Sequence, residues 1–174
     1  ARVRAVFNGA RMVDQNRNVI TGIEVKDGLH QTNASRLECI LFWLFAKGSG
    51  LEVQQGDISA AYLNAKPSQP TYVTLDLEIF ADAVTDPEQV QRAREIGESN
   101  GAFECLKSIY GSPRASFDWA KLISDILKKE FGFVNFSDSA IPNMFFKIKE
   151  GRILMVLLLY VDDFLIGGKA ADLR

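Results

Sequence analysis

The sequence predicts an α+β fold in which helices pack on an antiparallel sheet. Segments with the apolar period of a helix are interspersed with short strand-like segments along the chain. The last three predicted strands are joined by tight turns, which connect antiparallel neighbours and cannot connect parallel ones. A doubly wound parallel sheet would instead need a helix between successive strands.

The composition is that of an ordinary folded domain. The chain has 174 residues, of which 47% are hydrophobic and 24% charged, so it is long enough to bury a core. The longest apolar run is shorter than the roughly 20 residues that a membrane-spanning helix needs. The net charge of −2 lacks the basic excess of many nucleic-acid binders, but it does not exclude a local basic groove.

Few residues suit zinc, hydrolytic or redox chemistry. His30 is the only histidine, so a zinc site or a Ser-His-Asp triad is poorly supplied, and we expect this residue at the surface. Cys39 and Cys105 form no CxxC pair, and we expect reduced thiols in the core rather than a disulfide. The chain begins at Ala1 and stops at Arg174, soon after a predicted strand, so we expect it to be part of a longer polypeptide.

The first third of the chain predicts a strand, a loop and a helix. Residues 2–7 alternate basic and apolar side chains, as a half-exposed strand does. Residues 8–31 are polar with weak periodicity, and we expect a loop. Helix-capping residues at 32–35 precede apolar positions at helical spacing, and Gly48 or Gly50 would end that helix.

The middle of the chain predicts short strands separated by helices. Residues 51–58 indicate a strand that ends in an acid, and residues 59–64 then turn toward a helix. A second short strand is expected at 71–75. Residues 86–96 favour a polar surface helix with proline in its first turn, and residues 103–109 favour another strand.

The last third predicts a long helix followed by a strand hairpin. Residues 113–131 have the pattern of an amphipathic helix. Its predicted apolar face consists of Phe117, Ala120, Ile123, Leu127 and Phe131. Strands at 144–149 and 152–161 would form a hairpin around Glu150-Gly151, and residues 164–167 would pair back as a third strand.

Two adjacent carboxylates, Asp162 and Asp163, end the longest apolar run of the chain. They repel each other, so a structure without a cation has little reason to place them beside a buried strand. Mg²⁺ removes that objection because it prefers carboxylate oxygens and leaves positions open for phosphate. The alternative is that the pair merely occupies a turn, where Asp is common. The spacing alone leaves both interpretations open.

Asp57 ends another predicted strand and is a third candidate ligand. If its strand lies beside the hairpin, Asp57, Asp162 and Asp163 meet at one end of the sheet. Two Mg²⁺ ions there could hold an attacking and a leaving oxygen, as they do in polymerases. Because adjacent side chains of a strand point to opposite faces, we expect Asp163 to contribute less directly than Asp162.

Several segments together resemble the reverse transcriptases of copia-type LTR retrotransposons. Tyr160-Val161-Asp162-Asp163 resembles their Tyr-x-Asp-Asp box, and residues 55–64 are similar to their first catalytic box. Lys107-Ser108-Ile109-Tyr110-Gly111, with Ala115 and Trp119, resembles their Lys-Ala-Leu-Tyr-Gly stretch. Weaker similarities lie at residues 2–6, at residues 69–73, and at Gly132, Phe133, Ser137 and Phe145. The matches follow the family's order over nearly the whole chain.

The resemblance implies the fingers and palm of a right-hand polymerase. Residues 1–174 would form one incomplete reverse transcriptase domain, without the thumb and the RNase H part that follow in the family's polyprotein. The implied reaction is RNA-directed DNA synthesis, in which two Mg²⁺ ions, or Mn²⁺ in their place, help transfer a nucleotide from dNTP to a primer 3′-hydroxyl. The implied partners are dNTP and a primed RNA or DNA template, with no membrane, inside a cytoplasmic particle. This fragment by itself is expected to be weak or inactive.

The same resemblance implies roles for the acids and for the nucleotide-binding side chains. Asp57, Asp162 and Asp163 would be the metal-binding catalytic triad. Tyr62 occupies the sugar-gate position, where a ring excludes a 2′-hydroxyl, although a core aromatic is its alternative role. Arg4 is the first candidate for binding the triphosphate.

Four more residues complete the candidate set. Arg2 is the second candidate for the triphosphate, and a solvated strand face is the alternative for both basic residues. Tyr160 and Val161 would lie beside the primer end, which is compatible with ordinary hairpin packing. Arg114 stands where the family has Gln and could restore a cation near the nucleotide, or it could simply begin a helix at the surface.

The chain also departs from the family pattern. Pro113 replaces a Lys, Ser59 replaces another Lys, and residues 76–100 are longer and more acidic than the usual connector. These changes indicate a divergent branch or a decaying element, although the intact acids argue against extensive decay. A catalytically silent nucleic-acid-binding remnant is therefore the second hypothesis. A third, a phosphoacceptor module with clustered Asp on a parallel sheet, is disfavoured by the predicted hairpin.

Overall fold

The computed structural model describes residues 33–74, 84, 86–98, 102–112, 114–136 and 140–173. The expected strand at 2–7, the loop at 8–31, and the residues His30, Arg2 and Arg4 lie outside this part of the chain. The described helices are α1 (Arg36–Gly48), α2 (Ala61–Asn64), α4 (Pro87–Glu98) and α5 (Ala115–Lys129). The described strands are β1 (Glu52–Asp57), β2 (Tyr72–Val73), β3 (Phe103–Glu104), β4 (Val134–Asn135), β5 (Met144–Lys149), β6 (Arg152–Tyr160) and β7 (Asp163–Gly168).

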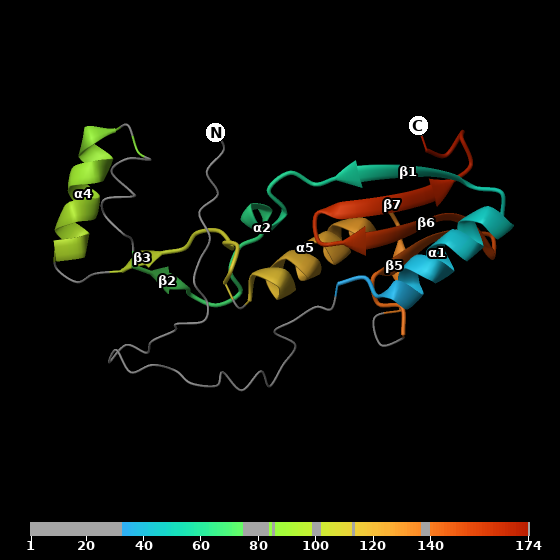
Figure 1. The fold of residues 1–174 in the computed structure, drawn as a ribbon, viewed down its shortest axis with the longest axis horizontal. Coiled ribbons are helices and arrows are strands. Elements are labelled where there is room, and N and C mark those ends of the chain that lie inside the picture. The colour runs from blue at the N-terminus through green and yellow to red at the C-terminus, as the bar shows by residue number, and fades with distance from the viewer. Residues whose placement is uncertain are drawn as a thin grey trace.

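A five-stranded antiparallel sheet forms the body of the molecule, in the order β1-β7-β6-β5-β4 (Figure 1). The mixture of helices with an antiparallel sheet agrees with the predicted α+β class. Strand β6 lies at the centre, and residues 155–159 of this strand are all buried. A strand buried on both faces must be apolar without interruption, which explains the unbroken apolar run in the sequence.

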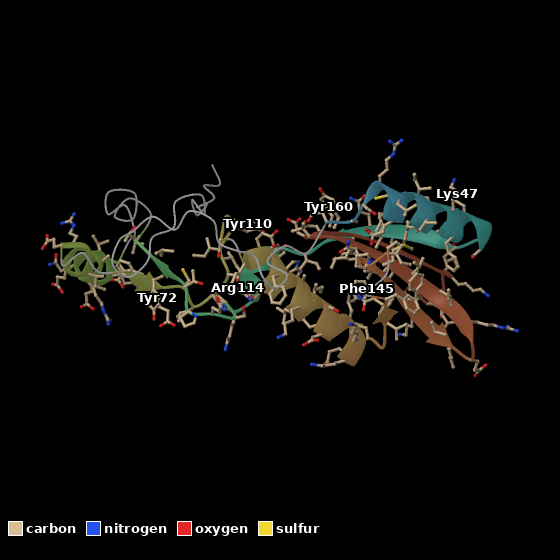
Figure 2. The ribbon with its side chains drawn as sticks, turned by 90° about the horizontal axis from the view of Figure 1, so that it is seen from below. Lys47, Tyr72, Tyr110, Arg114, Phe145 and Tyr160 are labelled. Atoms are coloured by element: carbon tan, nitrogen blue, oxygen red, sulfur yellow. The ribbon has the colours of Figure 1, made fainter. Side chains whose placement is uncertain are left out.

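Helices α1 and α5 cover opposite faces of the sheet (Figure 2). Side chains alternate along a strand, so Val156 and Leu158 of β6 pack in one cluster with Phe42 of α1. Leu157 and Leu159 belong to a second cluster, which contains Trp119, Ile123 and Leu127 of α5. The α1 face and the α5 face are used below for these two sides of the sheet.

Helix α1 begins after Ser35, which is one of the predicted capping residues, and its first turn contains a capping box. The Ser35 hydroxyl accepts a hydrogen bond from the Glu38 amide, and the Glu38 carboxylate accepts one from the Ser35 amide. Glu38 is only 1% exposed. Its second oxygen accepts a hydrogen bond from the Asn143 amide at 2.7 Å, which ties the start of α1 to the start of β5.

Helix α5 is shorter than predicted, and its apolar face differs in part. It ends at Lys129, and Gly132 adopts a φ of +69° in the turn that follows. Phe131 therefore lies beyond the helix and is 56% exposed, so its assignment to the apolar face is wrong. Phe117 is only partly buried, whereas Trp119 is buried.

The segment after β3 is not the continuous strand that the sequence predicts. β3 ends at Glu104, and the next amides pair with different parts of the chain. The Cys105 amide donates to the Thr71 carbonyl at 2.7 Å, whereas the Ser108 amide donates to the Ala65 carbonyl at 2.9 Å. The Cys105 bond continues the β2–β3 register, but the Ser108 bond leaves it, so the strand does not extend to residue 109.

The cysteines and the peripheral elements complete the fold. Cys39 and Cys105 are free thiols, and both are half-buried rather than in the core. Helix α4 is mostly exposed, as predicted, and it lies with the two-stranded sheet β2-β3 away from the five-stranded sheet (Figure 1). Among the described helices, none combines the length and apolar character needed to cross a bilayer.

Candidate active site

The backbone brings the three candidate acids to one end of the sheet. β1 pairs with β7 so that Asp57 lies directly opposite Asp163, and β6 pairs with β7 so that Tyr160 also lies opposite Asp163. The Ile58 amide donates to the Asp162 carbonyl at 2.7 Å, which continues the β1–β7 pairing to the hairpin tip. The strand that carries Asp57 therefore lies beside the acidic hairpin.

The three carboxylates do not form a ready-made metal cluster. Among the described residues, no group of three or more His, Cys, Asp or Glu side chains is close enough to hold a metal ion. Asp57 and Asp163 are register partners on neighbouring strands. Phe164, the residue after Asp163, packs on the α5 face, so Asp163 and its partner Asp57 lie on the α1 face. Asp162 lies in the turn and acts electrostatically on Tyr62, which packs against the α5 face.

The donor set nevertheless fits a hard divalent cation. All three groups are carboxylates, which Mg²⁺ prefers over nitrogen or sulfur ligands. Asp57 and Asp163 are exposed and Asp162 is half-exposed, so no buried contact fixes their rotamers. The chemistry and the backbone positions are compatible with a shared ion, provided that the side chains turn toward it.

The hairpin tip has an unusual backbone conformation. Val161 has a φ of +55°, a left-handed conformation that is a steric outlier for a β-branched residue. It is the first of the two residues between β6 and β7, and a two-residue hairpin requires positive φ at this position. The indole nitrogen of Trp119 donates a hydrogen bond to the Val161 carbonyl at 2.7 Å.

The aromatic side chain of Tyr62 lies close to the hairpin tip. It lies in the single-turn helix α2, which follows a left-handed Ala60 with a φ of +54°. Its ring contacts that of Tyr110, with centroids 4.7 Å apart and planes inclined by 47°. Burial raises the pKa of the Tyr62 hydroxyl, and the negative charges of ionised Tyr110 and of Asp162 raise it further. The phenol therefore stays neutral at physiological pH.

A glycine beneath an aromatic ring lies near the end of strand β1. Gly56 lies opposite Phe164 in the β1–β7 register. A Cβ atom at Gly56 would overlap the Phe164 ring, so the ring lies directly over the bare backbone. The contact requires glycine at this position and brings β7 close to β1 one residue before Asp57.

Arg114 and Tyr160 occupy different surroundings. The Nε atom of Arg114 donates to the Ser68 hydroxyl at 3.2 Å, and its guanidinium lies 5.2 Å from the centre of the Phe117 ring. Figure 2 shows Arg114 at the start of α5 and Tyr160 at the end of the sheet. Tyr160 lies opposite Asp163 in the β6–β7 register. Tyr160 is 48% exposed and available to a ligand.

Several residues of the site have a structural role that the sequence analysis did not assign. Trp119 and Tyr110 belong to a recognised motif, but nothing local indicates which atoms they contact. Gly56 has a local signal, because glycine inside a strand often marks a close approach. Asp118 is buried and one of its oxygens accepts from the Ser108 hydroxyl at 3.4 Å, a contact that only the fold reveals.

These features describe an antiparallel sheet, packed by helices, with three carboxylates near one end. Comparison with known proteins gives the family. The chain belongs to the reverse transcriptase (RNA-dependent DNA polymerase) family, whose model matches residues 3–173.

The chain is also similar to the retrovirus-related Pol polyprotein from transposon TNT 1-94 of Nicotiana tabacum. The two are 27% identical over 160 residues, which is 88% of this chain and 11% of that polyprotein. Together the matches confirm the copia-type retrotransposon resemblance. No solved structure gives a significant match.

Proposed function

We propose that this chain carries the nucleotidyl-transfer site of an RNA-directed DNA polymerase and joins dNTPs to a primer paired with an RNA or DNA template. Family membership supports the polymerase reaction. The observation that carries the proposal is the register of the sheet, which sets Asp57 opposite Asp163 at the acidic hairpin. The two residues are 106 positions apart in sequence, and an acid that merely occupied a turn would need no such pairing.

The proposed metal ligands are Asp57, Asp162 and Asp163. Magnesium bound there would neutralise phosphate charge and lower the pKa of the primer hydroxyl. The protein's own contribution would be positioning: the exposed Asp57 and Asp163 and the half-exposed Asp162 would hold the ion at the end of the sheet.

The aromatic residues around the acids would bind the sugar and the primer. Tyr62, held against Tyr110 and next to Asp162, would exclude a ribose 2′-hydroxyl. Val161 and the half-exposed Tyr160 would contact the primer end. Arg2 and Arg4 stay candidates for the triphosphate. Arg114, which contacts Ser68 and Phe117, would need to change partners to reach it.

Primer extension tests the proposal. The 174-residue chain, and a longer chain if the gene encodes one, is supplied with a primed RNA template, Mg²⁺ and dNTPs. We expect the longer chain to incorporate nucleotides, and we expect Asp162→Asn to abolish this activity because a neutral amide is a poor Mg²⁺ ligand. Asp172→Asn, at an exposed residue near the C-terminus, is the matched control and should retain activity.

Two results of this assay would reject the proposal. Robust synthesis by Asp162→Asn would show that the hairpin acid is not required. Template binding without any incorporation by the longer wild-type chain would favour the silent remnant. That alternative is consistent with the absence of a preformed carboxylate cluster among the described residues. Equal use of dNTPs and rNTPs by an active wild type would reject only the role proposed for Tyr62 and would leave the polymerase proposal standing.

A further inference from the structure

We propose that Trp119 is a positioning residue whose indole N–H holds the hairpin tip in the one conformation that aims Asp162. The inference rests on the proposed function for its catalytic consequence. The hydrogen bond itself is independent of that function: the Trp119 Nε1 atom lies 2.7 Å from the Val161 carbonyl oxygen, across 42 positions of sequence.

The tip needs such a partner because its backbone is strained. Val161 adopts a φ of +55°, where the branched Cβ crowds the neighbouring peptide. Strained backbone of this kind persists only when the surrounding structure over-determines it. A valine without external contacts at this position would favour extended backbone, which would move the turn and the acids that follow it.

Two donors from different elements supply the restraint. Trp119 of α5 donates to the Val161 carbonyl, and the Ile58 amide after β1 donates to the Asp162 carbonyl at 2.7 Å. These carbonyls belong to the peptide units on either side of the Asp162 Cα atom. Because both peptide planes are held, the direction in which the Asp162 side chain leaves the backbone is fixed.

Trp119 is itself well anchored. Its side chain is only 4% exposed and belongs to the cluster on the α5 face together with Ile123 and Leu159. Leu159 is two residues before the turn, so the same helix supports both the strand and the tip. A donor on a packed helix transmits little motion, and this is the property that a positioning residue needs.

The chain provides a matched pair of tryptophans for the test. Trp119→Phe keeps an aromatic ring in the core and removes the N–H donor. Trp43→Phe makes the same change on α1, where Trp43 is 43% exposed and far from the tip in sequence. We expect Trp119→Phe to lower kcat of primer extension by about 10- to 100-fold with little change in KM for dNTP. Trp43→Phe should leave both unchanged.

A second substitution separates positioning from loss of stability. Glycine adopts positive φ without steric cost. In Val161→Gly the tip therefore depends less on the indole hydrogen bond to keep its conformation. We expect the loss caused by Trp119→Phe to be smaller in the Val161→Gly background, whereas a general destabilisation would lower activity equally in both. Equal losses in the two backgrounds, or a Trp119→Phe protein as active as wild type, would overturn the inference.

Nuclear magnetic resonance tests the hydrogen bond without catalysis. We expect the carbonyl ¹³C resonance of Val161 to shift in Trp119→Phe and to stay in place in Trp43→Phe. An unshifted resonance would overturn the inference even if the protein is an active polymerase. A shifted resonance in a protein that incorporates no nucleotide would reject the proposed function while supporting the restraint of the tip.

Discussion

At the scale of single residues, Tyr62 shows how the fold alters a side chain's chemistry. Its sequence neighbours give no hint of a perturbed hydroxyl. In the structure its side chain is half-buried, its ring contacts that of Tyr110, and the charge of Asp162 in the hairpin acts on its hydroxyl. All three effects disfavour the phenolate, because burial removes its hydration and both neighbours carry or acquire negative charge.

The raised pKa of Tyr62 predicts a pH dependence of stability. The folded chain holds this proton more tightly than the unfolded chain, whose tyrosines ionise near pH 10.0. The stabilising contribution is thus complete below about pH 10 and is lost as the pH rises through the folded pKa. Tyr62→Phe cannot ionise, so its unfolding free energy should fall less than that of wild type in this alkaline range.

Urea unfolding at neutral and alkaline pH measures the effect. Tyr72→Phe is the control, because Tyr72 is 58% exposed and its hydroxyl is open to water. If the wild type and Tyr62→Phe lose the same free energy of unfolding between the two pH values, the shift at Tyr62 does not affect folding.

At the scale of elements, the buried Glu38 joins a helix to the central sheet. One of its oxygens accepts hydrogen bonds from the Ser35 amide, the Ser35 hydroxyl and the Asn143 side chain, and the other accepts from the Asn143 amide. The Asn143 carbonyl in turn accepts from the Leu159 amide at 3.1 Å. The start of α1 is therefore connected to the strand that leads into the acidic hairpin.

Loss of this carboxylate should destabilise the fold. Glu38→Ala removes the carboxylate half of the capping box and the acceptor of two hydrogen bonds from the buried Asn143. We expect a loss of about 2–4 kcal/mol in the free energy of unfolding. Glu88→Ala is the matched control, since Glu88 also lies in the first turn of a helix but is exposed. Its loss should stay within about 0.5 kcal/mol. A Glu38→Ala protein as stable as this control would show that the network contributes little.

At the scale of the whole molecule, stability should be distributed unevenly. β6 is central in a sheet covered on both faces, so exposure of its amides requires the loss of both clusters. β2 and β3 have two residues each and, within the part of the chain that the structure describes, pair with each other alone. The regions differ in the amount of apolar surface that must open, which sets the free energy of local unfolding.

Hydrogen exchange can measure this difference directly. We expect amides of β6 to exchange at least about 1,000-fold more slowly than those of β2 and β3, because the former need global unfolding and the latter only local opening. The comparison is internal to one sample and needs no variant. Equal protection of the two regions would mean that the small sheet and the large sheet unfold as one unit.

Much of the fold could be predicted because its signals are local. The hairpin at Glu150-Gly151 and the starts of α1 and α4 depend on turns, caps and periodicity within a few residues. The predicted strand at 103–109 is wrong for the opposite reason, because the Ser108 amide pairs with the distant Ala65 carbonyl. The place of Phe131 is wrong although its signal is local, since Gly132 in the turn after α5 directly follows it.

The sequence by itself determined which residues are candidates for binding a metal and a nucleotide, namely the acids at two strand ends and the tyrosine after the first strand. It also determined the order of motifs that places the chain in its family. Only the tertiary structure decided that Asp57 lies opposite Asp163, that α1 and α5 cover different faces, and that Trp119 reaches the Val161 carbonyl. The physical reason is range. Backbone periodicity acts over one or two turns, whereas the pairing of distant strands is chosen by the burial of both faces of the sheet.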